Sequence, residues 1–326
     1  MTAIDSTTSA EPAAPVPLRE GPALRYCRTG KWSWPRTIFG TLFVIVGWIF
    51  TFVVLVTPVN CVSALWYERP INDFTLVADR PDSFAVFLTF AMSIVIPTML
   101  VLRFLHRLSW RAALGSERHF DWDLFMRAAI AYLLVAVLGL AVTYVGAPQR
   151  MRIVPHGWQH GLWIALAMLV ILPQAFAEDY LFKGYLVRAW GAVIPCRFVV
   201  IPLLAAGFTS LHAVNPDVNA DRWFNLIQFF LAQLLMFGIF VRTGNLASAV
   251  GMHWAQNVIA FCLLKTPNNG RDDFALIDWL DPRLAAGVSR LSDPLAYVEL
   301  AVGLFALWAL LSWKRSPLYL RSASPL

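Results

Sequence analysis

The chain has 326 residues, of which 58% are hydrophobic and only 14% are charged, and its mean hydropathy is +0.60. A soluble domain carries charge on about a quarter of its residues, because it needs a polar surface. The composition therefore excludes a soluble globule, and it also excludes a disordered chain, a coiled coil and a small disulfide scaffold. It favours a protein that crosses a membrane several times, in which every charge inside an apolar span needs an explanation.

The first 35 residues (1–35) differ in composition from the rest of the chain. They are rich in Ala, Pro, Ser and Thr and show no hydrophobic period, which predicts a flexible cytoplasmic tail. The first apolar run begins near Ile38, behind a long polar lead, so the tail is not a secretory signal peptide. A transmembrane domain is predicted over residues 36–315, and a short C-terminal tail over residues 316–326.

Eight apolar segments make up this domain, and most have close to the twenty residues that a helix needs to cross the hydrocarbon core. They lack the alternation of barrel strands, so the predicted fold class is all-α, a polytopic bundle of about eight transmembrane helices. The predicted segments are Ile38–Val56, Phe84–Leu102, Ala128–Val145, Gly161–Trp190, Phe198–Val214, Phe224–Val241, Leu246–Leu264 and Ala296–Trp313. The Phe198–Val214 segment is short and has Pro202 near its start.

The charges in the connections predict how the chain is oriented. Lys and Arg outnumber Asp and Glu in the connections on the side of the N-terminus, whereas acids outnumber bases on the other side. The positive-inside rule then places both termini in the cytoplasm, and we expect an integral protein of the cell (plasma) membrane. The net charge of +6 is explained by this topology, so no nucleic-acid partner is predicted.

Three ionisable residues lie close together in the fourth segment: Glu178, Asp179 and Lys183. Such residues are costly inside a membrane and indicate function by default. Asp179 and Lys183 are four positions apart, which predicts an ion pair on one helix face. Glu178 points about 100° away from that face. We therefore expect it to have no partner on its own helix and to be satisfied by another one.

Two of the six histidines lie in predicted spans, His212 in the fifth and His253 in the seventh. Asn257 follows His253 by one helical turn. Counting about 1.5 Å per residue from the predicted cytoplasmic ends places these three residues at a depth similar to that of Glu178. The sequence thus predicts one polar layer built from three helices.

This layer suits hydrolysis. A carboxylate in an apolar pocket can act as general base toward water, and a neighbouring histidine can orient that water. A second histidine and an amide NH₂ can donate to a developing oxyanion. Alternatively, Glu178, His212 and His253 hold a zinc ion that carries a bound water.

The chain resembles a known family at these residues. The family is that of the CPBP (Abi, or CAAX-protease-like) intramembrane proteases, to which the Ras-converting CAAX endopeptidase belongs. Its motifs are EExxxR, FxxxH and HxxxN/D. Here they read Glu178-Asp179 followed by Lys183, Phe208 followed by His212, and His253 followed by Asn257. The resemblance covers a core at about residues 164–264.

The resemblance implies an intramembrane endopeptidase, a hydrolase of the CAAX prenyl endopeptidase type that is often described as metalloprotease-like. It implies that Glu178 is the base that activates water, with His212 assisting. It also implies that His253 and Asn257 stabilise the oxyanion.

The resemblance gives Asp179, Lys183 and Phe208 supporting roles. The chain departs from the family pattern at two of them, with Asp in place of the second Glu and Lys in place of Arg. Lys lacks the planar fork of Arg, so a bidentate clamp is lost, which leaves reduced activity or an unusual substrate open.

We expect chemistry that requires no cofactor, with zinc as the alternative. The expected partners are membrane lipids and a peptide or protein substrate that is prenylated or membrane-embedded. Two other functions stay open on the sequence alone. One is an ion- or proton-coupled transporter, for which buried acids and histidines are also typical. The other is a catalytically weak scaffold or immunity protein of the same fold.

Overall fold

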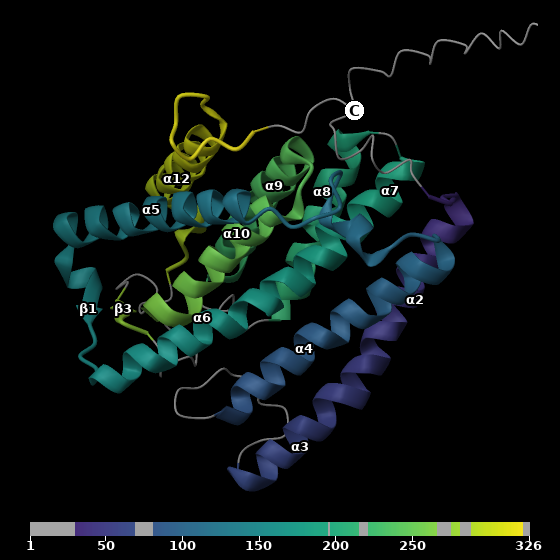
Figure 1. Ribbon diagram of the computed structural model, residues 1–326. Helices are drawn as coiled ribbons and strands as arrows, with labels where there is room; N and C mark the ends of the chain where they lie inside the picture. Colours follow the sequence, from purple (N-terminus) through teal and green to yellow (C-terminus); the bar gives the residue numbers. More distant parts are fainter. Residues whose placement is uncertain are drawn as a thin grey trace, which may run out of the picture.

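The computed structural model describes residues 30–68, 81–194, 196–214, 221–265, 275–280 and 288–321. The predicted N-terminal tail lies mostly outside these ranges, and so does the end of the predicted C-terminal tail. In the described ranges the protein is a helical bundle with one small sheet (Figure 1). The predicted all-α fold class is confirmed.

Seven helices of the described chain are long and apolar enough to cross a membrane, so this is an integral membrane protein. They are α2 with η1 and α3 (Trp34–Thr51, Phe52–Val56 and Thr57–Trp66), α4 with η2 (Pro81–Leu100 and Val101–Leu105), α5 (Trp122–Gly146), α6 with η5 and α7 (Trp158–Asp179, Tyr180–Leu186 and Val187–Val193), α9 (Arg222–Thr243), α10 with η8 (Leu246–Val258 and Ile259–Leu263) and α12 (Pro294–Ser312). The remaining predicted segment is α8 (Arg197–Leu211), an apolar helix of 15 residues.

The first span is longer than predicted. We expected it to end at Val56, but the helix continues to Trp66. The added turns carry the polar residues Asn60 and Ser63, which ended the apolar run in the sequence. Both are buried in the protein, and the Ser63 hydroxyl donates to Asp82 at the start of α4. Their polarity is satisfied inside the bundle, so it does not stop the helix.

Helix α10 lies at the centre of the bundle, between α5, α6 and α9 (Figure 1). In the most apolar 18-residue stretch of its span, 67% of the residues are buried. The same fraction is 11% for the Trp34–Trp66 span and 17% for the Pro294–Ser312 span. The outer helices therefore present their apolar residues to lipid, whereas α10 presents its residues to other helices.

One glycine allows α10 to approach α5 closely. A Cβ atom added at Gly251 would lie 2.3 Å from the carbonyl oxygen of Phe125 in α5. Small residues at such contacts allow helix backbones to pack tightly in a membrane. The packing fixes the position of His253, two residues further along α10.

The connections gather at the two ends of the bundle as the predicted topology requires. At one end β1 (Met151–Ile153) pairs antiparallel with β3 (Ile277–Trp279), which pairs parallel with β2 (Leu264–Lys265). At the other end the Ser116 amide donates to the Gly244 carbonyl at 2.8 Å. That second end is the one predicted to face the cytoplasm, and its orientation stays a prediction.

Candidate active site

The predicted ion pair between Asp179 and Lys183 is present, and both side chains are fully buried. The Lys183 ammonium also donates to Gln233 Oε1 on α9 at 3.0 Å. It lies 5.1 Å from the centre of the Phe208 ring and 4.8 Å from that of Phe237. A buried cation thus has a carboxylate, an amide oxygen and two aromatic faces around it, which compensates for the loss of hydration.

Glu178 has a partner on its own helix, and this part of the prediction was wrong. Gln174 lies one turn earlier in α6, and its amide donates to Glu178 Oε1 at 2.6 Å. The other carboxylate oxygen, Oε2, is buried and lies 3.5 Å from His253 Nε2. The expectation that another helix would also approach Glu178 is met by α10.

His253 touches both acids of the first motif. Its Nδ1 atom lies 3.1 Å from Asp179 Oδ1. A carboxylate that is paired with Lys183 is ionised and can only accept, so Nδ1 carries the proton and donates. In the neutral ring Nε2 is then an acceptor, and it is the atom that faces Glu178.

Asn257 is connected to Glu178 through Gln174. Its Nδ2 atom donates to Gln174 Oε1 at 2.9 Å, while the amide group of Gln174 donates to Glu178. This bridge uses one of the two N–H groups of Asn257 and leaves the other for a further acceptor.

His212 lies outside the direct contacts of Glu178. It begins the 3₁₀ turn η6 (His212–Val214), and its Nδ1 atom lies 2.9 Å from the carbonyl oxygen of Phe208. Its ring stacks on the Phe208 ring, with 4.6 Å between the ring centres. The Phe208 ring also contacts the His253 ring, with 5.6 Å between the centres. One aromatic ring therefore links His212 to the other motif residues.

The alternative zinc ligand set of Glu178, His212 and His253 is not gathered in the structure. Within the described ranges no group of three or more His, Cys, Asp or Glu side chains is arranged to hold a metal ion. His212 instead stacks on the Phe208 ring, and its Nδ1 atom lies 2.9 Å from the Phe208 carbonyl oxygen.

Two glutamines of the site were missed by the sequence reasoning. Gln174 carried a usable signal, because it precedes Glu178 by four positions and therefore shares its helix face. Gln233 carried none, because only the packing of α9 against α8 and α10 brings it to Lys183.

The chain after the acid pair is π-helical, from Tyr180 to Leu186. Such stretches are rare and often occur at functional sites. Gly184 lies in this stretch, where an added Cβ atom would be 2.6 Å from the carbonyl oxygen of Ala113. The close contact holds the segment that carries Lys183 against the loop before α5.

Comparison with known proteins gives a match for the part of the chain that carries these residues. Residues 158–259 match a family described as Type II CAAX prenyl endopeptidase Rce1-like. This segment resembles the Rce1-like family. It begins at the first residue of α6, ends just past α10 and contains all three motifs. The resemblance predicted from the motifs is confirmed. The Rce1-like segment is similar to a family of proteases.

A curated relative extends beyond the Rce1-like segment. The uncharacterized protein YyaK of Bacillus subtilis strain 168 is 23% identical over 171 residues, which cover 52% of this chain. The aligned part is 57% of the length of that relative. No solved structure matches the chain.

Proposed function

We propose that this protein is an intramembrane endopeptidase that hydrolyses a peptide bond with water activated by Glu178 and His253. Its substrate is a peptide or protein that is prenylated or embedded in the membrane. The observation that carries the proposal is the 3.5 Å approach of Glu178 Oε2 to His253 Nε2 in a buried site within the Rce1-like segment.

The protonation states explain why this approach suits a nucleophilic water. Nδ1 of His253 donates to Asp179, so Nε2 and the ionised Glu178 Oε2 are two acceptors that face each other. The 3.5 Å separation leaves no room for a water molecule between the two atoms, so we place the water beside the pair, where it donates to Glu178 Oε2 and keeps a lone pair for attack. Asp179 orients the imidazole, much as the carboxylate of a catalytic triad orients its histidine.

The proposed reaction uses this proton relay twice. The water oxygen bonds to the carbonyl carbon while its proton passes to Glu178, and the carbonyl oxygen becomes an oxyanion. The free N–H of Asn257 donates to that oxyanion. When the C–N bond breaks, the protonated Glu178 returns the proton to the leaving amine. His253 keeps its hydrogen bond to Asp179 through both steps and stays in contact with the Glu178 carboxyl group.

We propose roles for the histidines that differ from those the resemblance implies. His253 assists Glu178, which is supported by the contact between its Nε2 atom and Glu178 Oε2, whereas the Nδ1 atom of His212 lies against the Phe208 carbonyl oxygen. We propose that His212 and Phe208 form a wall of the site, with the exposed part of His212 toward the substrate. The role is supported by the stacking of the two rings.

Purified protein in liposomes tests the proposal. It is incubated with prenylated CaaX peptides, leader-type peptides and transmembrane peptides, with and without a chelator, and products are identified by mass spectrometry. Glu178→Gln is expected to lower the rate by about 10²–10⁴-fold, because a general base is lost. The control is Glu299→Gln, since Glu299 is an exposed acid of α12 outside the site.

The outcomes separate the proposal from its rivals. No cleavage of any peptide by the wild type would count against an endopeptidase and favour a scaffold. Ion flux that Glu178→Gln abolishes would favour a transporter. Loss of cleavage with chelator that zinc restores would contradict the metal-independent mechanism. It would still support a peptidase.

A further inference from the structure

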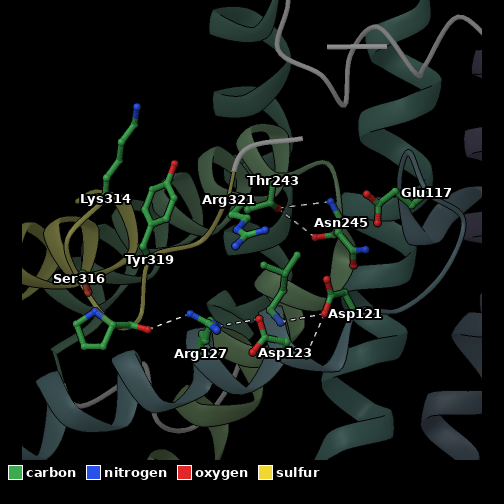
Figure 2. Close-up of a pocket in the computed structure, with 12 residues that line it drawn as sticks. Glu117, Asp121, Asp123, Arg127, Thr243, Asn245, Lys314, Ser316, Tyr319 and Arg321 are labelled. Carbon is green, nitrogen blue, oxygen red and sulfur yellow. Dashed lines mark hydrogen bonds and ion pairs between the residues drawn. The ribbon is translucent and has the colours of Figure 1, made fainter. Parts of the chain in front are cut away.

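A cavity of about 620 Å³ lies apart from the candidate active site (Figure 2). It is formed where the start of α5, the turn between α9 and α10 and the segment after α12 meet. None of its lining residues belongs to the Glu178–His253 site. Its charged lining residues are Glu117, Asp121, Asp123, Arg127, Lys314 and Arg321. Its volume is in the range of small-molecule sites.

The walls of this cavity are held together by long-range hydrogen bonds. The Asn245 amide donates to the His119 carbonyl oxygen at 3.1 Å, which joins the turn before α10 to the loop before α5. Arg127 donates to the Pro317 carbonyl oxygen at 3.0 Å, which joins α5 to the segment after α12. The backbone amide of Leu320 then donates to Leu311 at 3.0 Å. The cavity is therefore formed by the fold before any ligand arrives.

Two tryptophans place the cavity at the depth of lipid headgroups. Trp122 opens the span of α5, and Trp313 follows the last residue of the span of α12. Both are exposed, and each adjoins lining residues of the cavity in sequence. Exposed tryptophan at the end of a span marks the membrane–water interface.

The cavity has charges of opposite sign on different walls. Figure 2 shows Glu117 and Asp121 on the side of the α5 loop, and Lys314 on the side of the segment after α12, with Arg321 between them. Across the described part of the chain, neither Lys314 nor Arg321 forms an ion pair. Asp121 uses only Oδ1 to cap α5, so its second oxygen can still accept.

We propose that this cavity binds the headgroup of a phospholipid that carries a primary ammonium and a phosphate, as phosphatidylethanolamine does. The ammonium lies against Glu117 and Asp121, and the phosphate lies against Lys314 and Arg321. A headgroup with a phosphate but no ammonium could still meet Lys314 and Arg321, but it would leave Glu117 and Asp121 without a cation from the ligand. A choline headgroup has no N–H to donate to the carboxylates. The acyl chains would lie along the apolar outer faces of α5 and α12.

Lipid binding to the purified full-length protein tests this proposal. Native mass spectrometry in detergent gives the Kd for phosphatidylethanolamine, phosphatidylcholine and phosphatidylglycerol with identical acyl chains. The variants are Lys314→Ala/Arg321→Ala and Glu117→Gln. Arg315→Ala is the matched control, because Arg315 is exposed and adjacent but does not line the cavity. Thermal unfolding checks that each variant is folded.

We expect the wild type to prefer phosphatidylethanolamine over both other lipids. Loss of the two cations is expected to raise the Kd roughly thirtyfold, from the usual contribution of each basic residue near a lipid surface. Glu117→Gln is expected to reduce the preference over phosphatidylglycerol, and Arg315→Ala to change neither quantity.

Three results would overturn the proposal. One is equal binding of all three lipids, and another is an unchanged Kd in the folded double variant. The third is tight binding of glycerophosphoethanolamine, the soluble headgroup without acyl chains, which would make the occupant a soluble metabolite. None of these results depends on peptidase activity, so the proposed function stands or falls separately.

Discussion

The buried pair of Asp179 and Lys183 allows a quantitative test of the packing around the site. Both side chains are fully buried, and the only cation that faces Asp179 directly from its own helix is Lys183. In Lys183→Met the apolar stem is kept, but a carboxylate is left buried without its partner. Removal of one partner of a buried pair costs about 3–5 kcal/mol of unfolding free energy.

The second half of the cycle separates the charge from the packing. Asp179→Asn/Lys183→Met removes both charges, and the Asn amide can still contact His253. Replacing a buried pair by neutral groups is often close to neutral in stability. We therefore expect the double variant to recover most of the lost free energy of unfolding. Unfolding in bicelles, measured by steric trapping, gives this quantity for each variant.

The chain offers a matched control with the same spacing. Asp123 and Arg127 in α5 are also four residues apart and joined at 2.7 Å, but their side chains are 66% and 39% exposed. Arg127→Met removes this exposed pair and also the hydrogen bond to the Pro317 carbonyl oxygen, and it is expected to cost about 1–2 kcal/mol. Equal losses for Lys183→Met and Arg127→Met, or a double variant as unstable as Lys183→Met, would refute the reasoning.

Three further predictions concern other parts of the bundle. Gln174→Leu removes a donor and an acceptor from the bridge, so we expect the free energy of unfolding to fall by about 1–3 kcal/mol and peptide cleavage to slow; unchanged cleavage would show that the bridge has no part in the site. Gly251→Ala is expected to lower the free energy of unfolding by about 1–3 kcal/mol, because the added Cβ atom meets the Phe125 carbonyl oxygen. Gly238→Ala is the control, since Gly238 has open space around it, and it is expected to cost nothing. Equal effects of the two substitutions in thermal unfolding would contradict the contact. Burial lowers the pKa of His106, which lies just past the span of α4, so only the unfolded state takes up a proton as the pH falls below about 6.5. The free energy of unfolding is therefore expected to decrease below that pH and to stay constant above it, and His106→Gln should remove this dependence. A flat profile for the wild type in thermal unfolding from pH 8 to pH 5 would contradict the prediction.

Local rules were enough to predict seven of the spans, apart from the end of the first, and the ion pair. The spans follow from continuous apolar runs, and the pairing of Asp179 with Lys183 follows from helical spacing. The approach of His253 to Glu178 was predicted from depth alone: the span of Glu178 ends on the side where the span of His253 begins, and both residues lie at similar distances from that side.

Other features depend on packing that spacing does not determine. His212 was predicted at a depth similar to that of Glu178, but depth does not fix the direction of a side chain at the end of a helix. The Phe208 ring contacts both His212 and His253. Gln233 is one of several polar residues in a mostly apolar helix, and only the rotation of α9 decides that it faces Lys183 rather than lipid. The prediction that the first span ends at Val56 was wrong, because the sequence does not show that Asn60 and Ser63 are buried inside the bundle.

The central position of α10 has a consequence for how the protein enters the membrane. This helix is the most buried of the seven and also the least apolar, and it carries both His253 and Asn257. Alone, such a segment has a weak tendency to leave the translocon for lipid. The short turn of Gly244 and Asn245 joins it to the more apolar α9, so the two segments can enter as a hairpin. We therefore expect insertion of the helix that completes the site to depend on its more apolar neighbour α9.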